Sequence, residues 1–273
     1  MRYRLALPLM LVALLTSALP AGAQDKPAPA GKSGAKPQAE KAEWRSLFDG
    51  KSLAGWKTTE FGAHGTPAVE EGLLVLPAGD PLTGVTREKD DVPHINYEIR
   101  LEAQRVEGHD FFVCLTFPVR DSHASLILGG WSGGVCGISS IDDLDASENN
   151  TNSYRKFESG KWYTVRLRVL DQRIEAWLDD EQIVDADTSG KKISTRVEVS
   201  PSKPFGLATY MTRGAYRNIR LRELRPDEVK AAAAEGAGSG AKDAGVDPDA
   251  APAKAPVKAP AQPAGKAPAA AKP

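Results

Sequence analysis

Apolar and polar residues alternate along much of the chain between residues 44 and 225. Two stretches, 96–103 and 162–170, carry the pattern most regularly. Their apolar positions are Tyr97, Ile99, Leu101 and Ala103 in the first stretch, and Tyr163, Val165, Leu167 and Val169 in the second. A period of two places these side chains on one face of a β-strand and the intervening polar ones on the other. We therefore predict two strands that each bury one face.

Further short segments of this region are rich in apolar residues and are separated by Gly, Pro, Asp and Asn. They lie at residues 73–76, 111–117, 125–128, 135–138, 205–210 and 216–224. Residues 173–186 have the pattern of a hairpin that turns at Asp179 and Asp180. About ten strands without a helical period predict an all-β fold, an antiparallel β-sandwich of the jelly-roll type. By analogy with other sandwiches, its concave face offers a shallow groove for a ligand such as a sugar.

The N-terminal end of the chain has a different composition. Residues 1–23 begin with Arg2 and Arg4, continue with an apolar run and end in small residues. This order is typical of a secretory signal peptide, here cleaved before Gln24, and it predicts a bacterial protein that is secreted or periplasmic. No later segment is apolar enough to span a membrane.

Two segments that flank the domain are rich in Ala, Pro and Lys, at residues 24–43 and 226–273. They lack the branched and aromatic side chains that would offset the entropy of ordering them. We therefore expect disordered tails on either side of one domain at 44–225, with room for a short helix at 227–235. The tail lysines could contact an anionic cell envelope, although a solubilising spacer is the simpler interpretation.

The charge of the domain argues against one class of binding partner. Residues 44–225 contain 23 Lys and Arg and 27 Asp and Glu, a net charge of −4, which gives no basic surface for nucleic acid.

The two cysteines, Cys114 and Cys136, both lie in apolar runs. An even number in an exported protein permits a Cys114–Cys136 disulfide, and buried free thiols are the alternative.

Four segments of the domain resemble one known family. SLFDGKSLAGW at 46–56 and GAYRNIRLREL at 214–224 are similar to the first motif and the final strand of the 3-keto-disaccharide hydrolase domain family. FESGKWYTVRLRV at 157–169 and RIEAWLDDEQIVD at 173–185 resemble its internal hairpin. The resemblance covers residues 46–224 and implies a laminin G-like or concanavalin A-like jelly roll that acts on carbohydrate.

The family name implies hydrolysis of the glycosidic bond in sugars already oxidised at C3. A 3-keto group acidifies the neighbouring C2 proton, so a base could remove that proton and expel the leaving group at C1, with water adding afterwards. This reaction needs a base, an acid and a group that holds the enolate oxygen, often a metal.

The chain departs from the family where many members carry polar residues. HDFFVCLTF has His109 and Asp110 in place of an amide and a hydroxyl, and SHASLILGGWSGG replaces a strand centred on glutamate. TYMTRG has Thr212 and Arg213 where members often show a histidine. If these positions bear the family's chemistry, this chain has lost or replaced it.

Acidic side chains concentrate in one segment after residue 140. Asp142, Asp143, Asp145 and Glu148 are our candidates for substitute catalytic carboxylates. Asp142, Asp145 and Glu148 could instead bind Ca²⁺, which takes hard oxygen ligands, although the spacing differs from that of an EF-hand. The third interpretation is a solvated connection whose side chains cap its own backbone amides and rim the groove.

Two further residues are candidates for catalysis. Asp121 and His123 lie two positions apart at the start of a predicted strand and could form an orienting acid–base pair. The alternative is a surface turn after Pro118.

Four residues are candidates for sugar binding. Trp131 lies between glycine pairs, so its ring could stack on a sugar or pack in the core. Tyr154 and Arg155 follow the acidic segment and could face the same groove. His64 lies in a glycine-flanked loop that could form its rim.

Three functions follow from these observations. The first is a secreted hydrolase of 3-keto-glycosides, the second a non-catalytic glycan-binding module of laminin G or lectin type, and the third a cell-envelope tether. An enzyme should bring a histidine and two carboxylates together at one end of the concave face. A lectin needs only aromatic side chains and neutral hydrogen-bonding groups there.

Overall fold

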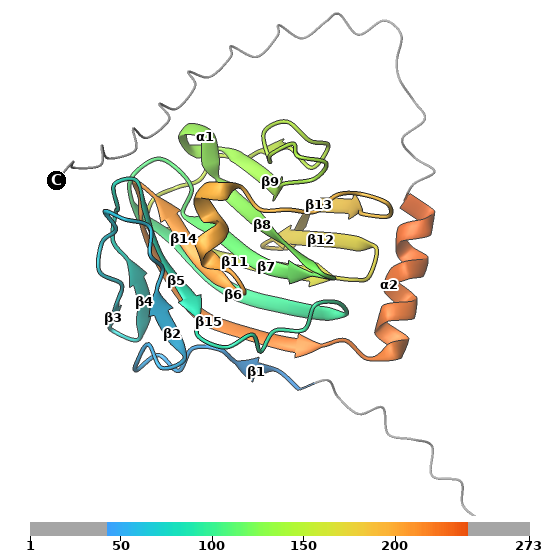
Figure 1. Cartoon of the computed structure of the whole chain (residues 1–273), viewed down its shortest axis with the longest axis horizontal. Helices are drawn as coiled ribbons and strands as arrows, with labels where there is room; N and C mark the ends of the chain where they lie inside the picture. The colour runs from blue at the N-terminus through green and yellow to red at the C-terminus, as the bar shows by residue number, and fades with distance from the viewer. Residues whose placement is uncertain (1–42, 240–273) are drawn as a thin grey trace, which may run out of the picture. The chain divides into compact units, whose positions relative to one another are not determined.

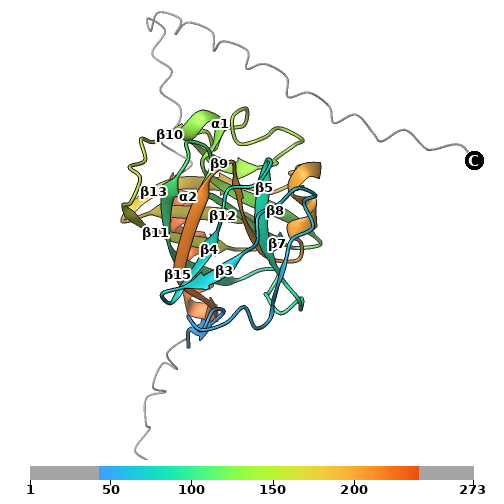
Figure 2. The same ribbon diagram turned by 90° about the vertical axis from the view of Figure 1, so that its left-hand side faces the viewer.

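The structure is a computed structural model that describes residues 43–239. The predicted signal peptide and most of both predicted tails lie outside these residues. The described part of the chain forms two antiparallel sheets packed face to face, which Figures 1 and 2 show from two directions. The predicted antiparallel β-sandwich is confirmed.

The first layer, the A sheet, has eight strands. They are β1 (Arg45–Ser46), β3 (Ala68–Glu70), β4 (Leu73–Leu76), β6 (Tyr97–Glu107), β11 (Trp162–Val169), β12 (Arg173–Leu178), β13 (Glu181–Asp187) and β15 (Arg213–Glu223). Their order is β13-β12-β11-β6-β15-β4-β3, with β1 paired to β15. The two eleven-residue strands, β6 and β15, are neighbours in this order. Their side chains point in turn to the inner and the outer face of the A sheet.

The second layer, the B sheet, has seven strands. They are β2 (Trp56–Thr58), β5 (Leu82–Arg87), β7 (Val113–Val119), β8 (Ser122–Gly129), β9 (Val135–Ser139), β10 (Ser153–Tyr154) and β14 (Gly206–Tyr210). Their order is β10-β9-β8-β7-β14-β5-β2. Three short helical segments, α1 (Gly130–Gly133), the 3₁₀ turn η1 (Val197–Ser202) and α2 (Pro226–Ser239), complete the described fold.

The core lies between the two sheets and contains the apolar positions that alternation predicts. The predicted inward residues of β6 and β11 are all buried there, against Leu115 and Phe117 of β7. Burying a leucine or phenylalanine side chain contributes roughly 1.5–3 kcal/mol, so this cluster dominates the stability of the domain. One hydrogen bond also crosses the layers, from the hydroxyl of Tyr97 to the carbonyl oxygen of Pro118 at 2.6 Å.

The two cysteines are free and buried, so the predicted disulfide is wrong. Cys114 lies on β7 and Cys136 on β9, with β8 between them in the sheet. Cys136 packs in the core between the sheets, whereas Cys114 belongs to the cluster on the opposite face. Burial raises the pKa of Cys114 to about 12 and that of Cys136 to about 11, which keeps both thiols protonated and unreactive.

The predicted disordered tail does not begin at residue 226, because α2 packs against the domain there. Val229 and Ala232 of α2 contact Leu170 and Leu224 and form a small apolar cluster with them. The Ala-rich composition of this segment does not predict such a contact. The carboxylate of Glu228 accepts a hydrogen bond from the backbone N–H of Arg225 at 3.0 Å and caps the first turn. The helix therefore exists, as expected, and is longer than 227–235. None of the helices among residues 43–239 is long and apolar enough to cross a bilayer.

Candidate functional site

The outer face of the B sheet, which points away from the core, is lined by small uncharged side chains. The outward positions of β5, β7, β8 and β14 include Gly84, Thr86, Cys114, Thr116, Ser125, Ile127 and Ala208. Thr116 and Ser125, on adjacent strands, share a buried hydrogen bond of 2.9 Å between their hydroxyl oxygens. No carboxylate lies at these positions, so this part of the face offers no base for proton transfer.

Two segments of the chain cover the centre of this face. Val199 of η1 and Ala146 pack into the apolar cluster outside the sheet. Gly206 is needed under η1, because a Cβ at this position would lie 2.7 Å from the carbonyl oxygen of Ser202. Much of the predicted groove is therefore filled by the protein's own residues.

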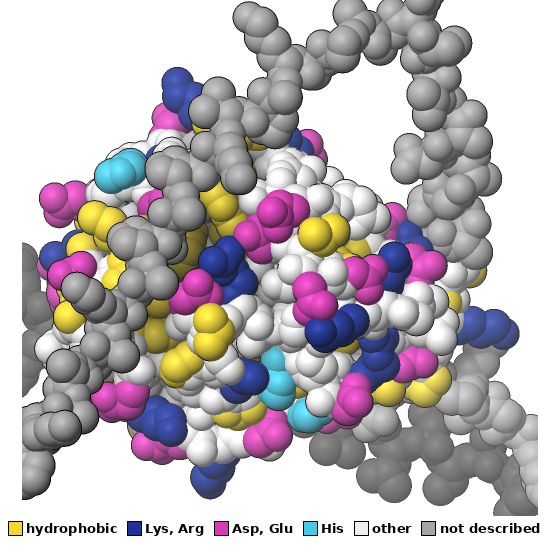
Figure 3. Space-filling view, turned by 45° about the horizontal axis from the view of Figure 1, so that its top comes forward, with side chains coloured by type: hydrophobic (Ala, Val, Ile, Leu, Met, Phe, Trp, Pro, Cys, Tyr) yellow, Lys and Arg dark blue, Asp and Glu magenta, His cyan; other side chains and the backbone are white. Residues whose placement is uncertain are grey.

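The uncovered part of the face is aromatic. We call the set of Phe61, Phe111, Trp131 and Tyr210 the aromatic hollow, because all four are only partly buried against this cluster. The rings of Phe111 and Tyr210 lie 5.6 Å apart at 48°. Phe61 lies against Gly84, where a Cβ would come within 2.8 Å of its ring. In the space-filling view, hydrophobic side chains gather in a recess of this face with charged side chains around it (Figure 3).

Trp131 reaches the hollow from an unusual backbone. Its φ of 48° and ψ of 61° lie in the left-handed region, which is unfavourable for a residue with a side chain. The neighbouring backbone N–H of Ser132 donates to the Asp110 carboxylate at 3.0 Å, which helps to hold this turn in place. The structure thus makes Trp131 part of the uncovered aromatic surface, and its role in stacking on a sugar stays a prediction.

The acidic loop, residues 140–152, is organised by its own polar side chains. The amide nitrogen of Asn149 lies 2.7–3.1 Å from the carbonyl oxygens of Ile138, Leu144 and Asp145. The amide oxygen of Asn149 accepts from the N–H and the hydroxyl of Thr151, at 3.0 and 2.6 Å. The third sequence interpretation, a connection that caps its own backbone, therefore describes the loop.

The carboxylates of the acidic loop are directed to cations rather than to one another. Asp142 pairs with Lys191 at 2.9 Å, and Asp143 with Lys192 at 2.8 Å. The hydrogen bond from Lys191 is the main reason that the pKa of Asp142 is lowered. Such exposed pairs contribute little to stability, but each of these carboxylates already has a cationic partner.

Asp145 faces the other covering segment. Its carboxylate contacts Arg196 at 2.7 Å, and the same guanidinium contacts Glu198 at 3.0 Å. The hydrogen bond from Arg196 is also the largest cause of the lowered pKa of Glu198. Asp145 and Glu198 are the sequence neighbours of Ala146 and Val199, which pack into the apolar cluster beside the hollow. This carboxylate–arginine–carboxylate group therefore lies on the two covering segments.

The predicted calcium site does not form. The carboxylates of Asp142 and Asp145 bind separate cations, and Glu148 is exposed, with its carboxylate 3.4 Å from the backbone N–H of Asp145. Within residues 43–239, no three His, Cys, Asp or Glu side chains come together in a group that could hold a metal ion. The catalytic role of these carboxylates stays a prediction, without a histidine among their hydrogen-bond partners in the described chain.

The predicted Asp121–His123 pair is wrong. Asp121 lies in the two-residue turn between β7 and β8, whereas His123 lies on β8 opposite Pro118. The ring of His123 instead stands edge-on to His94, with 6.1 Å between centroids, and its Nε2 is buried without a hydrogen bond. Partial burial is the main cause that lowers the pKa of His123.

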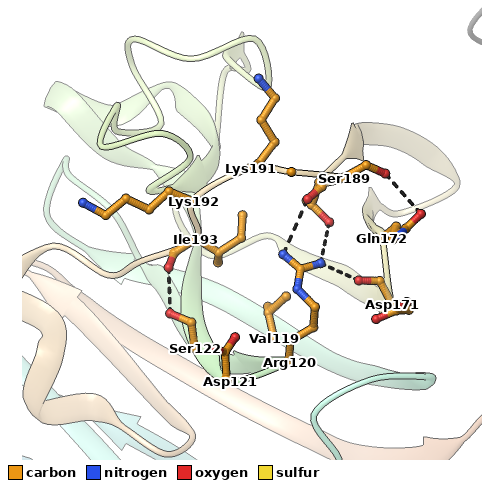
Figure 4. A pocket seen from close by; sticks show the side chains of 12 residues that line it. Val119, Arg120, Asp121, Ser122, Asp171, Gln172, Ser189, Lys191, Lys192 and Ile193 are labelled. Atoms are coloured by element: carbon orange, nitrogen blue, oxygen red, sulfur yellow. Dashed lines mark hydrogen bonds between the residues drawn. The ribbon is translucent and has the colours of Figure 1, made fainter.

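Asp121 instead lines a polar pocket of about 780 Å³ formed by three turns (Figure 4). The Arg120 guanidinium lies on its floor and donates to the carbonyl oxygen of Asp171 at 2.5 Å and to the hydroxyl of Thr188 at 3.2 Å. The ammonium groups of Lys191 and Lys192 point away from Arg120. None of the twelve lining residues is aromatic, so this pocket has no ring on which a sugar could stack.

The remaining predicted binding residues occupy separate places. The ring of Tyr154 is 70% exposed and lies directly on Gly134, near the turn that carries Trp131. Arg155 turns to Glu181 at 2.5 Å, at the edge of the A sheet, and so is used structurally. His64 hydrogen-bonds the carbonyl oxygen of Gly65 through Nδ1 at 2.9 Å, in the loop that also carries Phe61.

Sequence reasoning missed Phe61, Phe111, Tyr210, Arg196 and Glu198. One signal was available for Phe111, since neighbours in a strand point to opposite faces and only one of Phe111 and Phe112 can enter the core. Arg196 and Glu198 meet Asp145 across about fifty residues of chain, which no local pattern predicts.

The domain is an antiparallel jelly-roll sandwich with an aromatic surface left uncovered on the outer face of its B sheet. A family model described as the 3-keto-alpha-glucoside-1,2-lyase-like domain matches residues 43–222. The chain therefore belongs to this family, and the resemblance seen in the sequence is confirmed.

Three solved structures with a similar fold are remote from this chain in sequence. A proposed glycosyl hydrolase from Parabacteroides distasonis is 13% identical over 67% of this chain and 94% of its own, with a TM-score of 0.44. The carbohydrate-binding module CBM66 from Bacillus subtilis is 14% identical over 62% and 96%, with a TM-score of 0.42. A protein of unknown function with a galectin-like fold from Bacillus subtilis is 8% identical over 67% and 96%, with a TM-score of 0.47. No curated protein matches the sequence significantly.

Proposed function

We propose that the domain binds a carbohydrate in the aromatic hollow. The observation that carries the proposal is the set of four partly exposed aromatic side chains beside a sheet face with small, uncharged side chains. The C–H faces of a pyranose ring stack on such rings, which supply contact area at low entropic cost. In the sheet below, the hydroxyl groups of Thr116 and Ser125 are buried and hydrogen-bonded to each other.

The second candidate is lyase chemistry on a C3-oxidised glucoside, and the family match over residues 43–222 favours it. In this reaction a carboxylate takes the C2 proton, the C–H electron pair forms a C1=C2 bond, and the C1–O bond breaks. The departing oxygen then takes a proton and leaves as an alcohol. Asp145 or Glu198 would act as the base, and Arg196 would stabilise the developing enolate oxygen.

The geometry supports binding better than elimination. Arg196 lowers the pKa of Glu198, and a carboxylate with a low pKa removes a proton slowly. Asp145 also accepts hydrogen bonds at a single oxygen from the N–H and hydroxyl of Ser147, at 2.9 and 2.6 Å, and this fixes it as part of the loop. Binding needs no such base.

The signal-like sequence of residues 1–23 supports a place for this activity outside the cytoplasm. The tether function draws on the Ala/Pro/Lys-rich segments instead, most of which lie outside the described residues.

Calorimetric titration of the purified protein with α-glucosides and their 3-keto forms tests the binding proposal. Trp131→Ala and Phe61→Ala should each weaken binding at least roughly ten-fold, because stacking residues dominate such sites. Trp162→Ala is the matched control, since this tryptophan lies on the outer face of the A sheet. Equal affinity of wild type and both hollow variants would refute the proposed site.

The same samples test elimination. Release of aglycone from a 3-keto-α-glucoside, together with the ultraviolet absorbance of the unsaturated ketone, would establish lyase activity, and Asp145→Asn should abolish it. Sugar binding without aglycone release would leave recognition as the function and remove the lyase candidate.

A further inference from the structure

A row of arginines crosses the outer face of the A sheet, on the other side of the domain from the hollow. Arg166 on β11 is in register with Arg100 on β6, and Arg100 is in register with Arg220 on β15. All three side chains point away from the core, because their neighbours Val165, Leu167, Ile99, Leu101, Ile219 and Leu221 are buried in it. Adjacent strands are about 4.8 Å apart, so like charges lie side by side in this arginine row.

In the rows on either side of the arginine row, arginine and glutamate side chains pair with each other. On one side Arg168, Glu98 and Arg222 alternate in register, and Glu175 adds a further partner for Arg168 at 2.6 Å. Glu98 is shared, with contacts of 2.7 Å to Arg222 and 2.8 Å to Arg100.

On the other side of the arginine row, Glu102 is already occupied. It contacts Arg217 at 2.7 Å and Asn218 at 2.6 Å. Glu98, Glu175 and Glu102 therefore already form ion pairs with other arginines or with Arg100. Among residues 43–239, no ion pair includes Arg166 or Arg220. The arginine row retains an excess of positive charge at both of its ends.

Tryptophans hold the arginine row in place without neutralising it. The guanidinium carbon of Arg166 lies 3.5 Å from the centre of the Trp177 ring, and those of Arg100 and Arg220 lie 5.2 and 5.3 Å from Trp44. Stacking uses the flat face of a guanidinium and leaves its N–H edge available to an anion. Partial burial is the main cause that lowers the pKa of Arg166, Arg100 and Arg168 lower it further, and Glu98 and Glu175 act in the opposite direction.

Like charges directly opposite each other on neighbouring strands are destabilising, so an in-register row of three is explained best by an anionic ligand. We propose that the outer face of the A sheet, centred on Arg166, Arg100 and Arg220, is a docking surface for an acidic polysaccharide. Carboxylate or sulfate groups along an extended chain would each accept hydrogen bonds from a guanidinium edge. This surface is separate from the aromatic hollow, and the proposal stands whether or not a sugar binds there.

An acidic polysaccharide fits better than a nucleic acid. The arginine row is only three strands wide, so it could contact few phosphates of a duplex. The rings of Trp177 and Trp44 are covered by arginines and are not free to stack on bases.

Binding of the full-length protein to immobilised polygalacturonate, dextran sulfate and neutral dextran tests this surface, with a single-stranded oligonucleotide as competitor. We expect salt-sensitive binding to one or both acidic polymers and none to dextran. The double variant Arg166→Gln/Arg220→Gln should lose at least roughly ten-fold in affinity, because two charge-assisted contacts are removed. The matched control, Lys51→Gln/Lys57→Gln, removes the same charge from exposed positions outside the A sheet and should bind like the wild type.

The outcomes separate the interpretations. An equal loss in both double variants would show unspecific attraction to total charge and would overturn the proposal, as would a complete lack of binding by the wild type. Competition by the oligonucleotide at lower concentration than the polysaccharide would assign the surface to nucleic acid instead.

Discussion

Asn149 provides the sharpest test of how the acidic loop is held together. Its buried side-chain amide donates to carbonyl oxygens of the loop and of β9, and it accepts two hydrogen bonds from Thr151. Each net hydrogen bond contributes about 1 kcal/mol, and the groups left behind by a truncation can reach water only in part. We therefore expect Asn149→Ala to lower the free energy of unfolding by about 3 kcal/mol, or roughly 6–12 °C in melting temperature for a domain of this size.

Urea denaturation followed by tryptophan fluorescence measures this change, with Asn150→Ala as the control because Asn150 is exposed. Hydrogen exchange at the backbone N–H of Ile138, which donates to the Thr151 hydroxyl at 2.8 Å, reports on the loop itself. Asn149→Asp should be more harmful at pH 7 than at pH 5, because only a protonated carboxyl can donate to the carbonyl oxygens around it. If Asn149→Ala shifts the midpoint no more than Asn150→Ala, the loop is held by its ion pairs and our reasoning is wrong.

Four further outcomes follow from the structure. A thiol reagent should leave Cys114 and Cys136 unmodified in the folded protein and modify both in urea, because burial raises the pKa of each thiol and blocks access. The folded-state pKa of His123 lies below its ordinary value of 6.5, so stability should fall as the pH drops below 6.5, and His123→Gln should flatten this dependence in denaturation curves. Tyr97→Phe should cost about 1–2 kcal/mol in the same assay, because the carbonyl oxygen of Pro118 loses its cross-sheet partner. Millimolar Ca²⁺ should leave the melting temperature unchanged, and a clear rise would restore the calcium site that the ion pairs of the acidic loop argue against.

The sequence predicts those strands that bury only one face. Alternation marks β6, β11 and the β12–β13 hairpin, because their outer faces are charged while their inner faces are apolar. Alternation fails for β5, which is buried on both faces and carries Gly84 where Phe61 packs. Its apolar and polar residues therefore do not alternate along the strand. Strands of two or three residues, such as β2 and β10, are too short for any periodicity to appear.

Some residues of the candidate site can likewise be predicted from the sequence, and others cannot. Trp131 stands out in sequence because glycines surround it, and the structure places it in the hollow. Tyr210 does not stand out, because an aromatic residue on the outer face of a strand looks the same in sequence as one in the core. The pairing of Asp145 with Arg196 depends on how the acidic loop and η1 meet over the B sheet, and only the tertiary structure shows it.

The short strand β1 has a mechanical consequence. It pairs antiparallel with β15, with Arg45 opposite Leu221 and Ser46 opposite Arg220, so the chain enters the domain close to the end of the strand from which it leaves. Tension applied between residues 45 and 223 would therefore peel β1 away one residue pair at a time instead of shearing many hydrogen bonds together. The buried side chains of Leu47 and Phe48 are the first apolar contacts to resist. The domain should thus yield at low force along this edge while the paired centre of β6 and β15 remains intact.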